Sequence, residues 1–284
     1  MEGLMQGKTV LLTGGTNGIG LVTARELARM GAQVTIVGRN LQKCRAVVEA
    51  IDAETGSPVE FICADLSTLA GIKHTASSYV RSHPKLNVLV NNAGGVFLKR
   101  RITADGFEMT FALNHLNYFL LTNLLIDLLK VSAPARVVNV ASGLHRGATL
   151  DFDNLQGEQN YAGFRAYGQS KLANILFTYE LARRLEKSGV TVNAVHPGYV
   201  NTGLSLNNGF FFRVFAKLSA RLFGRKPEVG ALTSIYLASS PKVEGVTGKY
   251  FSDCKPEDSS FESYDKTTAE RLWRTSLELI GNAG

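Results

Sequence analysis

Two side chains in the middle of the chain have the types and spacing that acid–base chemistry needs. Tyr167 and Lys171 lie four positions apart at the head of a long apolar-periodic segment, so we predict a helix that carries both on one face. An ammonium group near a phenol favours the phenolate, and we therefore expect Lys171 to lower the pKa of Tyr167. A phenol with a lowered pKa can donate or accept a proton near neutral pH.

Two further polar residues occur in predicted elements that lie earlier in the chain. Ser142 follows a strand-like run at 136–140, where an open sheet would present its hydroxyl to a ligand. Asn114 interrupts an apolar run inside a long predicted helix from about Asp105 to Leu129. A polar side chain in such a run lowers stability unless it is paired, so Asn114 is either a satisfied core amide or a relay group.

A glycine-rich turn near the N-terminus joins a predicted strand at 8–12 to an amphipathic helix. Its glycines are Gly14, Gly18 and Gly20, and a second predicted strand follows at 33–37. Strand, glycine turn, helix and strand is the unit that binds dinucleotides, because the glycines let the backbone approach the pyrophosphate and the helix N-terminus supplies N–H groups. An ordinary tight turn is the alternative.

The end of the second predicted strand bears on which nucleotide would bind. An acidic residue there would hold the ribose 2′-hydroxyl of NAD, but the residues are Gly38-Arg39-Asn40. A guanidinium in place of a carboxylate favours the 2′-phosphate of NADP, so we expect NADP(H) as the cofactor. The alternative is that Arg39 is a solvated residue at a strand end.

Strands and helices alternate along the whole chain. We predict further strands at 59–63, 86–90, 136–140, 191–195 and 249–251, and further helices at 42–54, 70–82, 105–129, 167–185, 228–238 and 267–280. Alternation at this spacing predicts an α/β fold with one doubly wound, Rossmann-type, mainly parallel sheet and helices on both faces. Because no linker, repeat or low-complexity tract occurs, we expect a single domain over residues 1–284.

Composition excludes several other classes of protein. The 284 residues are 45% hydrophobic, yet no apolar run is long enough to span a bilayer, and the N-terminus does not resemble a signal peptide. The three cysteines lie far apart without metal spacing, so we expect a reducing, cytoplasmic location. The net charge of +7 suits anionic ligands, but no nucleic-acid-binding module occurs and we expect no nucleic acid partner.

The histidines do not indicate a metal site. No pair among the five has metal-ligand spacing, and His74, His83 and His145 are expected to be exposed or to lie in loops. We therefore expect no metal. A hydrolase is also disfavoured, since Ser170 lacks the second glycine of a G-x-S-x-G elbow.

Taken together, these motifs resemble those of the short-chain dehydrogenase/reductase family from Lys8 to about Phe251. The matching motifs are Thr13-Gly14-x-x-x-Gly18-x-Gly20, Asn91-Asn92-Ala93-Gly94, Asn114, Ser142, Tyr167-x-x-x-Lys171 and Pro197-Gly198. The runs 136–142, 171–174 and 248–253 narrow the resemblance to the retinol-dehydrogenase-like branch. Two departures are a missing apolar N-terminal segment, from which we expect a soluble protein, and Asn117, where that branch often has glycine.

The resemblance implies a mechanism and a set of site residues. Tyr167 would exchange a proton with the substrate oxygen, Ser142 would hydrogen bond that oxygen, Lys171 would hold the nicotinamide ribose, and Asn114 would anchor a relay water. The implied cofactor-binding residues are Gly14, Thr16, Asn17, Gly18, Ile19, Gly20, Arg39, Asp65, Leu66, Asn92, Ala93, Gly94, Tyr167, Lys171, Pro197, Gly198, Val200 and Thr202.

A basic, aromatic segment follows the predicted strand at 191–195. We expect a substrate lid at about 200–227, because residues 208–226 combine a stripe of basic side chains with many apolar ones, as in a basic amphipathic helix. The same pattern would suit peripheral contact with a membrane, or packing against the protein's own body or a second subunit of a homo-oligomer. A lid of this kind indicates a lipophilic small-molecule carbonyl or alcohol as substrate.

Two functions from different classes remain open. The first is an NADP(H)-dependent oxidoreductase that transfers hydride between the nicotinamide and a lipophilic carbonyl or alcohol. The second is an NADP-binding sensor or partner-binding module with little turnover. The presence of Asn114, Ser142, Tyr167 and Lys171 together favours the enzyme.

Overall fold

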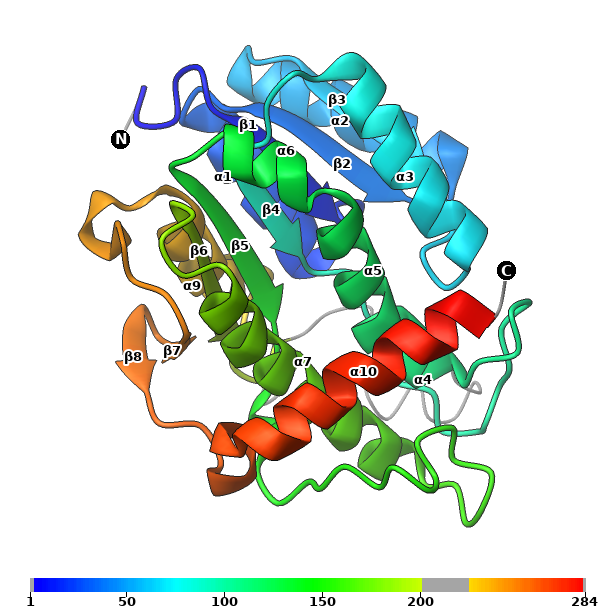
Figure 1. Ribbon diagram of the computed structural model, residues 1–284. Coiled ribbons are helices and arrows are strands. Elements are labelled where there is room, and N and C mark those ends of the chain that lie inside the picture. Colours follow the sequence, from blue (N-terminus) through cyan, green and yellow to red (C-terminus); the bar gives the residue numbers. More distant parts are fainter. Residues whose placement is uncertain (1–2, 201–224, 283–284) are drawn as a thin grey trace.

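Eight strands form one sheet in the order β3-β2-β1-β4-β5-β6-β7-β8 (Figure 1). The computed structural model describes residues 3–200 and 225–282. The strands are β1 (Thr9–Thr13), β2 (Gln33–Gly38), β3 (Val59–Cys63), β4 (Val88–Asn91), β5 (Ala135–Val140), β6 (Val190–His196), β7 (Lys249–Ser252) and β8 (Lys255–Glu257). Neighbours pair in parallel except β7 and β8, which are antiparallel. The predicted doubly wound, mainly parallel sheet is confirmed, and its order reverses direction between β1 and β4.

The helices connect these strands and cover the sheet. They are α1 (Gly18–Arg29), α2 (Leu41–Thr55), α3 (Leu69–Ser82), α4 (Met109–Phe111), α5 (Asn117–Leu124), α6 (Ile126–Val131), α7 (Gly163–Arg184), α9 (Pro227–Ser239) and α10 (Lys266–Asn282). A π-helix, η1 (Ala112–Leu116), joins α4 to α5, and short 3₁₀ turns occur at η2 (Gly143–His145), η4 (Pro241–Val243) and η5 (Phe261–Tyr264).

Alternate residues of the strands divide the core between the two faces of the sheet. Leu11 belongs to a hydrophobic cluster with residues of α3, α5, α7 and α10, whereas Val10 and Leu12 belong to one with residues of α1 and α9. In Figure 1 the first set of helices lies in front of the sheet, and α1 and α9 lie behind it. This two-sided burial follows from the near-continuous apolar strands of a parallel sheet.

The prediction of one continuous helix at 105–129 is wrong about where the helix starts and about its continuity. The helical region begins at Met109, because the Glu108 carboxylate accepts hydrogen bonds from the N–H groups of Thr110 and Phe111 at 2.8 Å each. The carboxylate of Asp105 instead accepts from the N–H of Leu69 at 2.8 Å. The region then passes through the π-helix and is interrupted again between α5 and α6.

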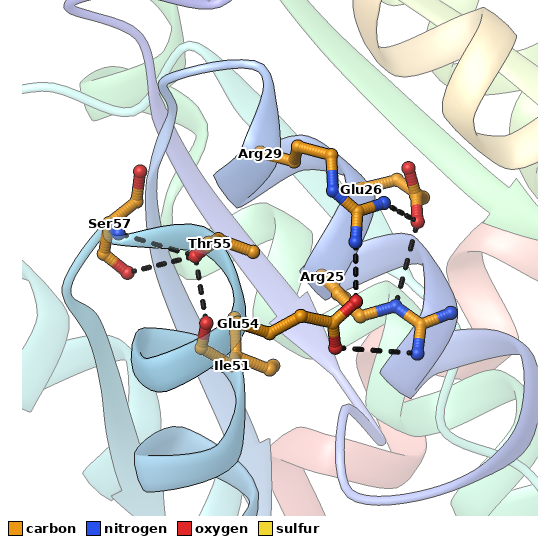
Figure 2. Close-up of polar contacts among 7 residues, drawn as sticks. All are labelled: Arg25, Glu26, Arg29, Ile51, Glu54, Thr55 and Ser57. Carbon is orange, nitrogen blue, oxygen red and sulfur yellow. Dashed lines mark hydrogen bonds and ion pairs between the residues drawn. The ribbon is translucent and has the colours of Figure 1, made fainter.

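Charged residues tie α1 to α2 on the outside of the fold. Glu54, in the last turn of α2, forms ion pairs with Arg25 and Arg29 of α1, and both arginines also pair with Glu26 (Figure 2). Close to Glu54, the Thr55 hydroxyl donates to the carbonyl of Ile51 at 2.8 Å. The network brings cations to the C-terminal end of α2, where a carboxylate alone would be unfavourable.

Two sequence-based expectations concern residues outside the described ranges. Most of the predicted lid at 200–227 and the amphipathic segment at 208–226 fall in 201–224, and Thr202 falls there too. Among the helices that the structure describes, none is long and apolar enough to cross a bilayer.

Candidate active site

Ser142, Tyr167 and Lys171 converge at the carboxyl end of β5. Ser142 follows this strand after one residue, and its hydroxyl accepts a hydrogen bond from the N–H of Leu144 at 3.3 Å, which starts the turn η2. Tyr167 and Lys171 lie one turn apart on α7, and both side chains are buried. The Lys171 ammonium Nζ donates to the carbonyl of Val140 at 2.8 Å and lies 5.7 Å from the centre of the Tyr167 ring. The helix α7 begins at Gly163, so Tyr167 is in its second turn.

Burial determines the protonation of this pair. It raises the pKa of Tyr167 to about 12, and a side-chain hydrogen bond with Ser142 opposes that shift. Burial also lowers the pKa of Lys171 to about 7. The prediction that Lys171 lowers the pKa of Tyr167 is therefore wrong for the protein alone, since desolvation penalises the charged form of each group.

The side-chain amide of Asn114 lies next to this pair and makes three hydrogen bonds. Its Oδ1 accepts from the N–H of Gly95 at 2.8 Å, and its Nδ2 donates to the Gly95 carbonyl at 3.1 Å and to the Ser170 hydroxyl at 2.9 Å. A side chain at Gly94 would come within 3.0 Å of Asn114 Oδ1 and 3.7 Å of Lys171 Nζ. The Asn114 amide thus fixes the loop after β4 against α7, and its role as a relay group stays a prediction.

The glycine turn between β1 and α1 is a cradle that side chains would fill. A Cβ at Gly20 would lie 2.3 Å from the Gly14 carbonyl oxygen, and one at Gly14 would lie 2.9 Å from Ala93 Cα. Asn17 precedes α1 without a side-chain cap, and no acidic residue occurs in the first turn. The residues present, Thr16 and Ile19 included, therefore fit a dinucleotide diphosphate, whose charge suits uncapped N–H groups at a helix start.

Asn92 holds this glycine turn in place. Its side-chain amide donates to the carbonyls of Thr13 at 2.9 Å and Gly14 at 3.2 Å. The N–H groups of Asn92 and Ala93 donate to the Thr13 hydroxyl at 2.9 and 3.0 Å. The ends of β1 and β4 are thereby joined at the point where the strand order reverses, which is where open sheets bind ligands.

Arg39 and Asp65 lie at the ends of the next two strands. Arg39 is exposed and follows Gly38, at which a Cβ would lie 2.6 Å from the Thr16 side chain. Arg39 is therefore next to the glycine turn. The Asp65 carboxylate accepts from the hydroxyl and N–H of Ser67 at 2.8 and 3.0 Å, and Leu66 beside it is buried.

The loop after β6 brings Pro197, Gly198 and Val200 to the same edge of the sheet. Gly198 has a φ of +81°, which glycine adopts readily, and a Cβ there would lie 2.9 Å from the Arg225 side chain. Val200 forms an isolated bridge with Arg225, whose guanidinium pairs with Asp253. The structure describes all of the predicted site residues except Thr202. Those that follow β1, β4, β5 and β6 lie together at the carboxyl ends of these strands.

The family follows from a sequence comparison. A model described as "short chain dehydrogenase" matches residues 8–209. The chain is a short-chain dehydrogenase.

Its relatives place this short-chain dehydrogenase in the retinol-dehydrogenase-like branch. It is 43% identical to human retinol dehydrogenase 14, over 98% of this chain and 88% of that protein. It is 45% identical to mouse retinol dehydrogenase 12, over 97% and 87%, and 43% identical to human polyprenol dehydrogenase, over 96% and 85%. The resemblance inferred from the motifs is therefore confirmed.

Solved structures agree with the fold. A protein from Mycobacterium paratuberculosis matches with a TM-score of 0.79 and 32% identity, over 97% of this chain and 94% of that one. A short chain dehydrogenase from Burkholderia cenocepacia in complex with NADP matches with a TM-score of 0.67 and 28% identity, over 87% and 96%. The chain thus belongs to a family of oxidoreductases that use a nicotinamide cofactor.

The structure of this short-chain dehydrogenase adds one site residue that the sequence reasoning missed. Tyr118 is buried, and Lys171 Nζ lies 5.5 Å from the centre of its ring, a cation–π distance. Tyr118 is four positions after Asn114 in the same helical region, and that spacing was the available signal.

Two histidines, His145 and His196, lie close to the turn that carries Ser142. His145 was expected in an exposed position or a loop; it lies in the turn η2 between β5 and α7 and is fully buried there. His196, at the end of β6, lies against the turn that carries Ser142. Within the described parts of the chain, no group of histidine, cysteine, aspartate and glutamate residues could hold a metal ion.

Proposed function

We propose that this protein is an NADP(H)-dependent oxidoreductase that transfers hydride between the nicotinamide and a carbonyl or alcohol group of a lipophilic substrate. The observation that carries the proposal is the convergence of Ser142, Tyr167 and Lys171 at the sheet edge that also carries the glycine turn. A binding module would need the glycine turn but not a buried phenol and ammonium beside a serine hydroxyl.

The chain's own residues supply position, hydrogen bonds and a proton. When bound, the nicotinamide supplies the hydride chemistry. The Tyr167 hydroxyl donates a proton to the substrate oxygen in the direction of reduction, and burial keeps that phenol protonated at neutral pH. Ser142 hydrogen bonds the same oxygen and stabilises the charge that develops on it. Lys171 would hold the ribose, and Asn114, which fixes the loop after β4, would anchor a relay water.

The residues that would hold the cofactor lie in the loops after the carboxyl ends of the strands. The N–H groups at the start of α1 would bind the diphosphate. Leu66, Ala93 and Gly94 would line the adenosine and ribose, and Pro197, Gly198 and Val200 would line the nicotinamide, with Thr202 beyond them. Arg39 would bind a 2′-phosphate, and the NADP complex of the Burkholderia relative supports that choice of cofactor.

The cofactor preference can be tested at Arg39. An Arg–phosphate hydrogen bond contributes about 1.5–3 kcal/mol, or roughly 10- to 150-fold in affinity. We therefore expect Arg39→Asp to shift the ratio of kcat/KM for NADPH over NADH by at least roughly 10-fold toward NADH. Arg45→Asp, an equal charge change at an exposed residue of α2, should leave the ratio unchanged. Wild-type protein that uses both cofactors equally well would contradict the preference.

The proposal of a lipophilic substrate rests on the relatives and on the surface near Ser142. The relatives are named for retinol and polyprenol. Leu144 and Tyr199, which lie two residues after Ser142 and after Pro197, are 51% and 57% exposed. We further propose that residues 200–227 form a lid over the substrate. We also propose a cytoplasmic location with contact between residues 208–226 and a membrane surface. The test is a panel of retinal, steroid ketones, long aldehydes and short polar aldehydes with NADPH oxidation as the readout.

The proton-transfer role is tested by Tyr167→Phe, which removes one hydroxyl and keeps the ring. We expect kcat to fall by roughly 10²-fold or more while the Kd for NADPH changes little. Tyr236→Phe, on α9 at the other face of the sheet, is the matched control and should keep full turnover. Turnover by Tyr167→Phe near that of the wild type would remove Tyr167 from the mechanism.

The alternative of an NADP-binding sensor predicts a different outcome. Such a protein would bind NADPH but oxidise it with none of the carbonyl compounds in the panel. The four site residues Asn114, Ser142, Tyr167 and Lys171 would then affect cofactor affinity alone.

A further inference from the structure

The peptide group that joins Ser142 to Gly143 is held on both sides by histidine side chains. The Ser142 carbonyl oxygen lies 2.6 Å from Nδ1 of His145, which is three residues further along the turn. The Gly143 N–H donates to Nδ1 of His196 at 3.0 Å, and His196 is the last residue of β6. One peptide plane behind Ser142 therefore has an imidazole at each end.

The hydrogen-bond partners fix the tautomer of each ring. Nε2 of His145 accepts from the N–H of Ser260 at 3.0 Å, and a backbone N–H can only donate. The ring proton of neutral His145 is therefore on Nδ1, where it donates to Ser142. In His196 the acceptor is Nδ1, which also lies 3.4 Å from the N–H of Gly198, so its ring proton is on Nε2.

Packing leaves little freedom for either ring. His145 is fully buried, and its ring centre lies 5.0 Å from that of Tyr250 on β7. A Cβ at position 143 would lie 3.1 Å from Nε2 and 3.3 Å from Cε1 of His196. Glycine at 143 thus permits the imidazole to approach the peptide. The two rings connect Ser142 to β6 and, through Ser260, to the segment before η5.

We propose that His145 and His196 are positioning residues that hold the Ser142 peptide, so that the serine hydroxyl stays within reach of Tyr167 and the substrate oxygen. This role rests on the function proposed above for Ser142. It requires both imidazoles to be neutral, because each uses an unprotonated nitrogen to accept a backbone N–H.

Acid should therefore loosen the turn. Protonated His196 would direct an N–H of Nδ1 at the N–H of Gly143, and protonated His145 would do the same to Ser260. Arg225 and Arg146 face His196 and oppose its protonation, while Asp253 favours it. Arg146 and His196 oppose protonation of His145, and Glu262 favours it. Burial is the largest cause that lowers the pKa of each ring, so both are neutral at pH 7.

The kinetic test compares two replacements of His196. The Oδ1 of asparagine can take the place of Nδ1 and accept from Gly143, whereas leucine has a similar bulk and no acceptor. We expect His196→Leu to lower kcat roughly 10-fold, which corresponds to about 1.4 kcal/mol, with smaller effects on KM and on the Kd for NADPH. His196→Asn should restore most of that loss. Equal losses in both variants would show that the acceptor is not what matters and would overturn the proposal.

The pH profile separates positioning from a merely structural role. Wild-type kcat should decline in acid, at a pH below the ordinary histidine pKa of about 6.5, because burial lowers the pKa of both rings. In His196→Asn the group that accepts from Gly143 does not titrate, so the acid limb should change from one that depends on two rings to one that depends on His145 alone. An unchanged acid limb, with an unchanged melting temperature, would contradict the role of His196.

A spectroscopic test examines the proposed hydrogen bonds of the two histidines and does not depend on enzyme activity. ¹⁵N-histidine labelling of the full chain reports which ring nitrogen is protonated at each of the five histidines, with His145→Gln and His196→Asn assigning the signals. We expect the Nδ1–H tautomer at His145 and the Nε2–H tautomer at His196 at pH 7. The opposite tautomers would overturn the proposal. A protein with these tautomers that reduces no carbonyl compound would instead count against the proposed function.

Discussion

Desolvation is the main influence on the ionisable residues of the candidate site. Tyr167 is held as a phenol with a pKa of about 12, and the pKa of Lys171 is lowered to about 7. Neither shift could be predicted from a spacing of four residues, because the sequence shows that the two side chains share a helix face and not that the face is dry. The carbonyl of Val140 that Lys171 contacts is 31 residues away in the sequence.

The depressed pKa of Lys171 makes a prediction for the stability of the protein without cofactor. Below about pH 7 the folded and unfolded chains both carry the proton, and the penalty for burying the charge is fully present. Between pH 7 and the ordinary value of 10.5 the unfolded chain binds the proton and the folded protein does not, so the free energy of unfolding rises with pH. For one proton the slope is at most about 1.4 kcal/mol per pH unit.

Urea denaturation of the cofactor-free protein between pH 7 and about pH 9.5 measures this slope, below the range in which tyrosines ordinarily titrate. We expect Lys171→Met to flatten the rise. Lys73→Met, at an exposed lysine of α3, should keep it. Parallel curves for the wild type and Lys171→Met would mean that the Lys171 ammonium is charged in the folded state across this range.

Helix ends and irregular turns position the site at the scale of elements. The π-helix η1 contains Asn114 and lies between α4 and α5. A π-turn accommodates an extra residue and often occurs at functional sites. Here the turn lies where the Asn114 amide reaches Gly95 on one side and Ser170 of α7 on the other.

The sequence predicts the existence of the elements better than their ends. The strand–glycine turn–helix unit and the helix with Tyr167 follow from apolar periodicity, which tertiary packing preserves. The helix start at 105 was wrong because Asp105 caps α3 rather than its own helix, and Glu108 does the capping. Which of two nearby carboxylates caps a helix depends on what lies across the fold.

The ion-pair network between α1 and α2 gives a prediction at this scale. Glu54 is 46% exposed and meets two arginines, so we expect Glu54→Gln to lower the free energy of unfolding by up to about 1 kcal/mol at low ionic strength. The difference should shrink in about 1 M salt, where the Debye length is about 3 Å. Glu49→Gln makes the same charge change elsewhere on α2 and controls for net charge. An equal loss of stability in both variants would mean that the network itself contributes nothing.

At the scale of the whole molecule, α10 ties the end of the chain to the central helices. Trp273 packs against Phe119 of α5 at 4.9 Å between ring centres, and the guanidinium of Arg184 lies 4.1 Å from its ring. Ser276 of α10 hydrogen bonds His115 at 2.9 Å, and burial lowers the pKa of His115 to about 3. These contacts join segments that are far apart in the sequence, since Ser276 and His115 are separated by 161 residues.

Because Trp273 is the one tryptophan of the chain, its fluorescence tests the single-domain prediction. We expect the fluorescence transition in urea to coincide with the loss of far-UV ellipticity, as in one cooperative unit. A fluorescence transition at lower urea would mean that α10 separates before the sheet unfolds. Trp273→Phe should retain the ellipticity transition within roughly a few tenths of a molar of urea and serves as the blank for the emission signal.

Some residues of the candidate site could be predicted from the sequence and others could not, depending on whether their partners are local or distant in the chain. The glycine turn, Ser142, Tyr167 and Lys171 could be predicted because each is a local pattern at a predicted strand end or on a predicted helix. His145 could not, since its partner Ser260 is 115 residues later in the chain and only the packed fold brings them together.

The last strand of the sheet has a consequence for assembly. β8 consists of Lys255, Pro256 and Glu257, all exposed, and it forms the outer edge beside β7. A strand from a second molecule that approached this edge would meet a proline without an N–H and side chains of both charges. Such edges resist pairing with further strands. If copies of this protein associate, we expect no strand of one copy to extend the sheet of another at the β8 edge.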